Sequence, residues 1–312
     1  MLIVDTHCDT SAQLIATNSN LYSNKLHVDL ERQLKAGSFV QFFAAFVDHG
    51  EFRGNEMRRA VQLIDKIYTE AEQYNNFIEI CTCTDDINRT IEKGKVAAVL
   101  SIEGGEALEG ELSALRTFYR LGVRCLGLTW NYRNEIADGV GAAASCGGLT
   151  PFGREVIAEM NKLGMIVDVS HLSEKGFWDV IELSASPIIA SHSNAWAVCD
   201  HPRNLTDSQI KALKNNGGVM GMNFCPDFLN KSGRAVIDDV VKHIEHIAGI
   251  AGEDHIGIGA DFDGIDYTPE DLKGVEDLNG LFERLLALNY SECFVEKIAG
   301  KNYMRVIKEV IK

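Results

Sequence analysis

The sequence predicts an α/β fold, a (β/α)8 TIM barrel of the metal-dependent hydrolase type with extra helices at its C-terminal end. Short apolar runs rich in β-branched residues alternate with amphipathic stretches, which is typical of parallel βαβ units. Eight such runs occur, the number of strands that closes a barrel. The 312 residues suit one barrel, which typically needs roughly 250 residues. No Pro/Gly/Ser-rich linker divides the chain, so residues 1–312 are expected to form a single barrel domain.

The expected strands are short, apolar and each followed by a polar segment: residues 2–4, 39–47, 96–102, 123–129, 165–169, 187–191, 218–223 and 256–259. Between them, apolar residues recur with helical periodicity. These helices are expected over residues 56–72, 112–121, 153–163, 173–183, 208–214 and 237–251, with two or three more between 278 and 311.

The ends of these helices carry suitable residues. Thr150 precedes Pro151 and Thr206 precedes Asp207, which predicts two N-caps. Glycines stand just after three helical runs, at positions 122, 164 and 217. Glycine is favoured there because the residue after a helix often adopts a left-handed conformation. Each glycine leads directly into an expected strand.

A doubly wound open sheet is the rival fold. It predicts a glycine-rich phosphate turn after an early strand. Gly139-Val-Gly141 is the nearest candidate, but it lacks the third glycine and the preceding strand. The barrel is therefore favoured.

The composition excludes several classes of protein. The net charge of −15, without a basic patch, argues against nucleic-acid binding. An acidic surface suits a site that attracts cations, although it equally serves solubility alone. No leader pattern and no 18-residue apolar run occur, so neither a membrane span nor a removed signal is expected. Of the eight cysteines, Cys125, Cys225 and Cys293 lie in apolar runs and are interpreted as reduced, core-filling thiols, which favours a cytoplasmic location.

Polar residues gather where the expected strands end, the place where barrels of this kind carry their chemistry. They are Asp5, His7 and Asp9 after the first strand, Glu103 after the third, Asp168 and His171 after the fifth, His192 after the sixth, and Asp261 and Asp263 after the eighth.

The spacing indicates which side chains can meet. In a strand, side chains alternate, so His7 and Asp9 point the same way while Cys8 points opposite. His171 and His192 are 21 residues apart, a spacing that fits one helix between neighbouring strands. Histidines and carboxylates around one rim form a nitrogen and oxygen ligand set that suits Zn²⁺ or another divalent ion.

Each residue alone has an ordinary structural explanation, such as a strand-end cap or a hydrogen-bonded histidine. The joint occurrence of three of the nine histidines with carboxylates at strand ends favours a metal site. His243 and His246 are three residues apart on one helical face, but they lie mid-helix, away from the strand ends, and are interpreted as a solvated face. His49 is expected to approach the mouth from the loop after the second strand.

At these residues the sequence resembles the renal (membrane) dipeptidase family, peptidase family M19, within the amidohydrolase superfamily. The matching segments occur in family order: Asp5-Thr-His-Cys-Asp9, Ile102-Glu-Gly-Gly105, Asp168-Val-Ser-His171, Ser191-His-Ser193, Pro202-Arg-Asn204 and Gly259-Ala-Asp-Phe-Asp-Gly264.

The resemblance implies a site for two divalent metal ions, with Zn²⁺ the expected pair. It implies that His7 and Asp9 hold one ion and that His171 and His192 hold the other, with Glu103 bridging both. It also implies that Asp261 transfers the proton and that Arg203 binds the carboxylate at the end of the substrate. The family usually has a histidine in the segment after the fourth strand, where this chain has Trp130. Trp130 and Asn131 are expected to contact the substrate, and this departure leaves its preference open.

The hypothesis for the reaction is hydrolysis of dipeptides, including ones with a D-residue at the C-terminal side. Two cations about 3.5–4 Å apart lower the pKa of a bridging water from 15.7 toward about 7, so hydroxide attacks the peptide carbonyl at neutral pH. Asp261 accepts the proton and returns it to the departing amine. A guanidinium pairs with a carboxylate through two parallel hydrogen bonds, so Arg203 selects short substrates with a free C-terminus.

Two alternatives stay open. The same metal pair supports other amidohydrolase reactions, namely deacylation of N-acyl amino acids or hydrolysis of a lactone or cyclic amide. A barrel that has lost activity and serves as a binding protein is the non-enzymatic alternative. Dipeptides are the expected small-molecule partner, and a homodimer is expected by analogy with the family. The glycine-rich segment 137–148 is interpreted as a mobile loop over the mouth.

Overall fold

Eight parallel strands form a closed ring in the computed structural model, which describes residues 1–145 and 147–311. The sheet runs β2-β1-β9-β8-β7-β6-β5-β4, and pairing between β2 and β4 closes it. The strands are β1 (Leu2–Cys8), β2 (Ser38–Phe46), β4 (Val96–Glu103), β5 (Val123–Gly127), β6 (Ile166–Asp168), β7 (Ile189–Ala190), β8 (Val219–Met222) and β9 (Ile256–Ile258). The predicted barrel and its eight strands are confirmed.

A ninth strand, β3 (Ile78–Ile80), was not predicted. It pairs with the first half of β4, from Val96 to Ala98, whereas β5 pairs with β4 from Leu100 onward. β3 therefore extends the sheet outside the ring. Three residues are too few for an alternating pattern to be recognised in the sequence.

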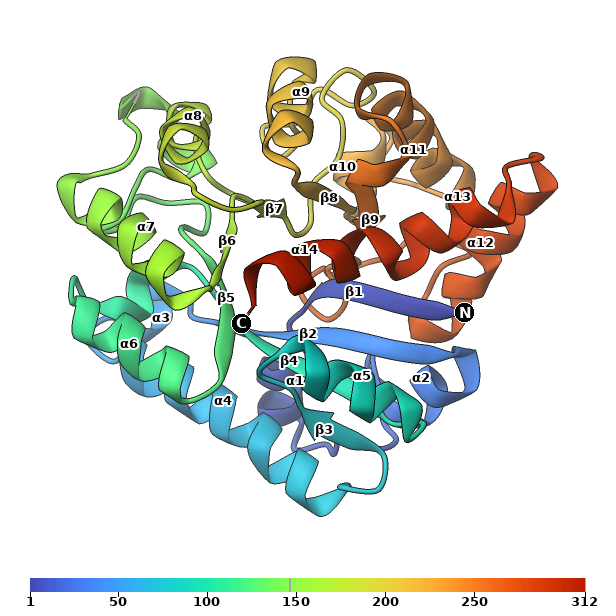
Figure 1. Cartoon of the computed structure of the whole chain (residues 1–312), viewed down its shortest axis with the longest axis horizontal. Coiled ribbons are helices and arrows are strands. Elements are labelled where there is room, and N and C mark those ends of the chain that lie inside the picture. Colours follow the sequence, from blue (N-terminus) through green and yellow to red (C-terminus); the bar gives the residue numbers. More distant parts are fainter. Residues whose placement is uncertain (146, 312) are drawn as a thin grey trace.

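Helices surround the ring, and each strand is followed along the chain by at least one of them (Figure 1). They are α1 (Thr10–Thr17), α2 (Leu30–Ala36), α3 (His49–Phe52), α4 (Glu56–Gln73), α5 (Thr84–Glu92), α6 (Leu112–Arg120), α7 (Pro151–Leu163), α8 (Glu174–Leu183), α9 (Asp207–Asn216), α10 (Pro226–Leu229), α11 (Ile237–Ala251), α12 (Leu278–Ala287), α13 (Glu292–Glu296) and α14 (Asn302–Val310). Every predicted helix is present. The prediction missed α1, α2, α3, α5 and α10, each of nine residues or fewer.

The predicted helix ends are confirmed. The Thr150 hydroxyl accepts a hydrogen bond from the Gly153 amide at the start of α7, and Thr206 forms a capping box with Gln209 at the start of α9. Gly164 and Gly217 have φ values of 72° and 83° directly after α7 and α9. Each helix thus ends with the chain turned toward the next strand.

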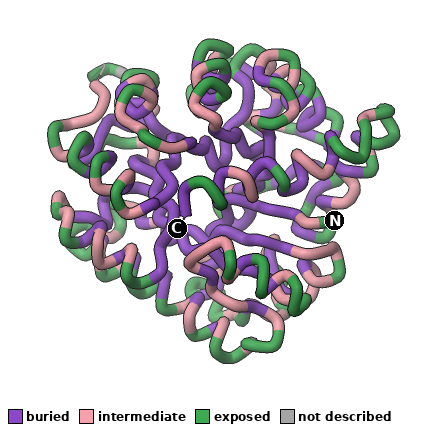
Figure 2. The backbone as a smooth tube through the Cα atoms, in the orientation of Figure 1, coloured by how far each residue is buried: buried purple, intermediate pink, exposed green. Residues whose placement is uncertain are grey.

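The last helix closes the end of the barrel at which the strands begin. Figure 1 shows α14 across the centre of the molecule, in front of the strands. Its buried side chains, led by Tyr303, form one apolar cluster with inward-facing residues near the strand starts, such as Val4 and Val219. Tyr303 packs directly on β9 at Gly257. A Cβ atom on that glycine would lie only 2.2 Å from the Tyr303 ring, so no larger residue fits there. The strands are buried and the outer helix faces exposed (Figure 2).

Seven cysteines of the described part carry free thiols. Cys125 is buried in the core, as expected, but Cys225 is only half-buried and Cys293 is exposed. The expectation of a core-filling thiol was wrong for Cys293, because that residue lies in the short helix α13 with its side chain facing outward. None of the described helices is both long and apolar enough to cross a membrane.

Candidate metal centre

His7 stands at the end of β1, buried among carboxylates. Its Nε2 lies 3.2 Å from Oε2 of Glu103 and 3.4 Å from Oδ2 of Asp9. The thiol of Cys8 points the opposite way and donates to the Phe42 carbonyl, as strand alternation predicts. His7 and Asp9 therefore face one point inside the barrel mouth.

Glu103 lies between two groups of ligand atoms. Its Oε2 faces His7, while its Oε1 is 2.9 Å from Nε2 of His171 and 3.5 Å from Nε2 of His192. β4 carries this carboxylate into the mouth at the same height as Phe46 on β2, its register partner. One side chain thus joins the β1 residues to the β6 and β7 residues.

Hydrogen bonds at Nδ1, the ring nitrogen that does not face Glu103, orient His171 and His192. Nδ1 of His171 lies 2.8 Å from Oδ1 of Asn131, and Nδ1 of His192 lies 2.7 Å from the Ser191 hydroxyl, which in turn donates to Asp168 at 2.5 Å. A carboxamide oxygen only accepts, so the His171 proton resides on Nδ1. The Ser191 proton goes to Asp168, so His192 donates from Nδ1 too. Both Nε2 lone pairs are left free for a metal ion.

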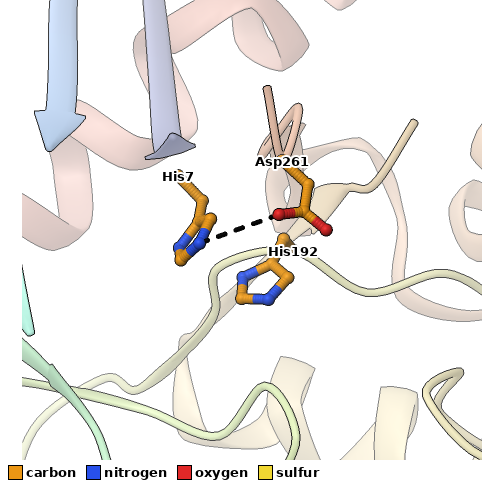
Figure 3. Close-up of side chains that lie close together, drawn as sticks. All are labelled: His7, His192 and Asp261. Atoms are coloured by element: carbon orange, nitrogen blue, oxygen red, sulfur yellow. Dashed lines mark ion pairs between the residues drawn. The ribbon is translucent and has the colours of Figure 1, made fainter. Parts of the chain in front are cut away.

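Asp261 follows β9, which neighbours β1 in the ring, and reaches the same point. Its Oδ1 lies 3.8 Å from Nε2 of His7, while Asn223 donates to its Oδ2 at 2.8 Å. Figure 3 shows His7, His192 and Asp261 converging from three strand ends. His171, Asp261 and Asp263 have φ values of 66°, 62° and 66°, a left-handed conformation that costs free energy in non-glycine residues and is typical of functional sites.

The converging side chains have the composition and geometry of a metal site. Ligand atoms within 4.8 Å of one another form three overlapping sets: His7, Asp9 and Glu103; Glu103, His171 and His192; and His7, His192 and Asp261. Nε2 of His7 and Oδ1 of Asp9 are buried without a hydrogen-bond partner. Buried polar atoms normally find partners, and a cation would supply one to both.

The charges of the cluster act strongly on one another. Burial alone would lower the pKa of His7, but Glu103 and Asp9 outweigh burial and raise that pKa well above its ordinary value. Burial and the nearby Glu103 carboxylate raise the pKa of Asp9 to about 7. Burial and the positive charge of Arg203 lower the pKa of His171 to about 3. His171 is therefore neutral, which is the form that binds a metal ion, whereas a cation would have to displace the proton that the raised pKa keeps on His7.

A cleft of about 340 Å³ opens over the cluster and also exposes the predicted substrate residues. Arg203 lines it with only 4% of its surface exposed; its Nη2 donates to the His192 carbonyl, and its Nε has no hydrogen-bond partner. Trp130 and Asn131 line the same cleft. Most of the predicted site residues therefore line one opening, and His7 and His192 lie buried beneath it in contact with Glu103.

Sequence reasoning missed the side chains that orient this cluster, and it misjudged one histidine. Ser191 and Asn223 were not predicted, although each stands within two residues of a strand end. His243 was expected on a solvated face, which is wrong: it is fully buried, accepts from the Ala195 amide and lies 2.9 Å from the Leu229 carbonyl. α11 turns this side chain inward, so it supports loops instead of facing water. His49 pairs with Glu56 at 2.8 Å and is not among the residues lining the cleft.

A closed parallel barrel with histidines and carboxylates at the C-terminal ends of its strands defines a metal-dependent hydrolase with the amidohydrolase fold. The model of the membrane dipeptidase family, peptidase family M19, matches residues 1–312, and the chain belongs to this family of metallo-dipeptidases.

Relatives of known structure cover the whole chain. The crystal structure of dipeptidase AC, a metallopeptidase of family M19, has 30% sequence identity and a TM-score of 0.92, and covers 100% of this chain and 99% of that chain. A metallopeptidase from Rhodobacter sphaeroides, solved with a phosphinate mimic of the dipeptide L-Ala-D-Ala, has 29% identity and a TM-score of 0.90, over 99% of both chains. A dipeptidase of Schizosaccharomyces pombe is 36% identical over 98% of this chain and 80% of its own length.

Proposed function

We propose that this protein hydrolyses dipeptides with two divalent cations, zinc in the native enzyme, held in the barrel mouth. His7 and Asp9 would bind one ion, His171 and His192 the other, and Glu103 both. The observation that carries the proposal is the position of Glu103, whose two oxygens face the two groups of ligands at 3.2 Å and 2.9 Å. Bound there, the cations would lower the pKa of water and polarise the peptide carbonyl.

Asp261 is the proton carrier in this proposal. Its Oδ2 accepts a hydrogen bond from Asn223, which leaves Oδ1 facing the reaction site. Burial raises the pKa of Asp261 above its ordinary value, so the carboxyl can hold a proton between taking it from water and giving it to the leaving amine. Asn223 fixes the rotamer of the carboxylate and so the direction of proton transfer.

Arg203 binds the free carboxylate of the substrate. Its guanidinium is buried at the cleft wall and retains an unpaired Nε–H, which a carboxylate would accept. Removing that charge from water is costly unless the substrate supplies the partner, which favours substrates whose C-terminus is next to the cut bond. Because the Rhodobacter sphaeroides relative is liganded with a mimic of L-Ala-D-Ala, dipeptides with a C-terminal D-residue are part of the proposal.

Asp261→Asn, with metal analysis, tests this function. We expect about two ions per chain in both proteins by the two-metal hypothesis. The variant should retain the ions and lose about 10²–10⁴-fold in kcat on dipeptides, the usual contribution of a general acid–base. Glu270→Gln is the matched control, since Glu270 is an exposed carboxylate nine residues further along the chain, is not among the residues lining the cleft, and should leave kcat unchanged.

The substrate panel contains L,L- and L,D-dipeptides, N-acyl amino acids and lactones. Turnover of the acyl compounds or lactones without turnover of dipeptides would replace the proposed reaction with another amidohydrolase reaction. Equal activity of Asp261→Asn and wild type would remove Asp261 from the mechanism. The cytoplasmic location, supported by the free thiols, and the homodimer stay predictions.

A further inference from the structure

An aromatic wall stands at one side of the cleft. We use this name for Phe46 and Trp130, which both line the cleft and whose rings lie 5.3 Å apart. Phe46 is the register partner of Glu103, so its ring stands beside the carboxylate that joins the two ligand groups. Tyr132 packs edge-on against Trp130 at 5.5 Å and is 64% exposed, so it supports the wall from the solvent side.

Phe46 of the wall lies opposite Arg203, and Trp130, which follows β5, stands between them around the ring. Arg203 follows β7, and Phe46 ends β2; these strands are four places apart in a ring of eight, whichever way the ring is followed. The ligand cluster occupies the space between them. A dipeptide with its carboxylate on Arg203 therefore crosses the cluster and carries its N-terminal residue toward the wall.

The charges in the cleft restrict what the wall can accept. Six carboxylates line the cleft, those of Asp9, Glu103, Asp227, Asp261, Asp263 and Asp266, against the single guanidinium of Arg203. Among the described residues that line the cleft, no lysine or arginine other than Arg203 is present to pair with an acidic substrate side chain. Two half-exposed aromatic faces instead offer apolar area and edge-to-face packing.

We propose that Phe46 and Trp130 form the subsite for the side chain of the N-terminal residue, and that the enzyme selects dipeptides with a bulky apolar, above all aromatic, residue there. This inference rests on the proposed dipeptidase function. The aromatic ring of the substrate packs on the wall while the peptide bond lies over Glu103 and its neighbours. Acidic N-terminal residues are disfavoured by the carboxylates around them.

The test compares Phe-Gly, Ala-Gly and Asp-Gly, because a C-terminal glycine removes any effect of stereochemistry at that residue. We expect kcat/KM for Phe-Gly to exceed that for Ala-Gly by at least about tenfold, which corresponds to about 1.4 kcal/mol. Asp-Gly should be the poorest of the three. Phe46→Ala and Trp130→Ala should each bring the Phe-Gly to Ala-Gly ratio close to one. Trp130→Leu, which keeps apolar volume, should give an intermediate ratio and serves if the alanine variant folds poorly.

Trp196→Ala is the matched control. Trp196 is another exposed aromatic side chain at the rim, but it is not among the residues lining this cleft, so the ratio should stay at the wild-type value. The reversed pair, Gly-Phe and Gly-Ala, identifies which end of the substrate meets the wall. A change in the reversed ratio in place of the first would overturn the assignment to the N-terminal residue.

The failures can be told apart. If wild type cleaves Phe-Gly and Ala-Gly equally well and neither wall variant changes the ratio, the wall has no role in specificity while the dipeptidase function stands. If wild type with bound metal cleaves no dipeptide, the proposed function fails and the subsite with it.

Discussion

The two ends of the barrel contribute oppositely to the stability of the fold. At the mouth, six buried ionisable side chains crowd together, and three residues of the rim have left-handed backbones. At the other end, Tyr303 and its neighbours on α14 fill the ring with apolar surface against the glycines of β8 and β9. Crowded charges and strained backbone cost folding free energy, whereas close apolar packing stabilises. The closed end therefore stabilises a fold whose open end is built for binding and not for stability.

Removing the carboxylate of Glu103 should disrupt metal binding at the mouth without affecting the stability that the closed end provides. For Glu103→Gln we expect loss of at least one metal ion per chain and a fall in kcat/KM of at least about a thousandfold, since a metal contributes several kcal/mol to the transition state. Inductively coupled plasma analysis and a dipeptide assay measure both. Glu106→Gln, three residues along the same segment, should keep the metal; an active, metal-replete Glu103→Gln would contradict the shared-ligand assignment.

Truncating Tyr303 at the closed end should lower the stability of the fold and leave the metal site at the mouth intact. Tyr303→Ala removes a large buried ring and should lower the free energy of unfolding by about 3–5 kcal/mol, as is usual for large aromatic residues. The metal content and the kcat of the folded fraction should be unchanged. Tyr303→Phe is the matched control: the hydroxyl has no hydrogen-bond partner, so its loss should be close to neutral. Urea unfolding decides, and a large drop in kcat with little change in stability would reject the division between the two ends.

Removing a side chain that hydrogen-bonds to a metal ligand, without being a ligand itself, should have an intermediate effect on metal binding. Ser191→Ala removes the acceptor for Nδ1 of His192 and should weaken metal affinity by about 10–100-fold, the usual effect of such orienting partners. Competition with a chelator measures the affinity. Ser193→Ala is the control, because that hydroxyl contacts Ser170 and not the His192 ring. Equal affinities in the two variants would mean that His192 needs no orienting partner.

The smallest effect concerns pH. Burial raises the pKa of Glu106 from its ordinary 4.5 to about 7. Between these values the folded protein holds a proton that the unfolded chain has already released, so the wild type loses stability as pH rises. Glu106→Gln cannot release a proton and should gain about 1–2 kcal/mol over wild type between pH 5 and 8. Urea unfolding at both pH values is the measurement; a stability difference that does not change with pH would place the Glu106 pKa near its ordinary value.

Much of the fold and of the cluster could be predicted because their signals are local. Alternation placed His7 and Asp9 on one side of β1, and apolar runs located all eight strands of the ring. Thr150 and Thr206 predicted the starts of α7 and α9 from single side chains. The misses are short elements such as β3, whose three residues carry too little pattern, and His243, whose burial depends on loops far away in sequence.

The sequence by itself determined which residue types reach the ends of the strands, because strand periodicity and chain order are properties of neighbouring residues. Only the tertiary structure decided which of them meet. Glu103 contacts His7, His171 and His192 because the pairing of β2 with β4 closes the ring. The bonds of Asn131 to His171 and of Asn223 to Asp261 join residues 40 and 38 positions apart. Such contacts follow from barrel closure, which no local pattern encodes.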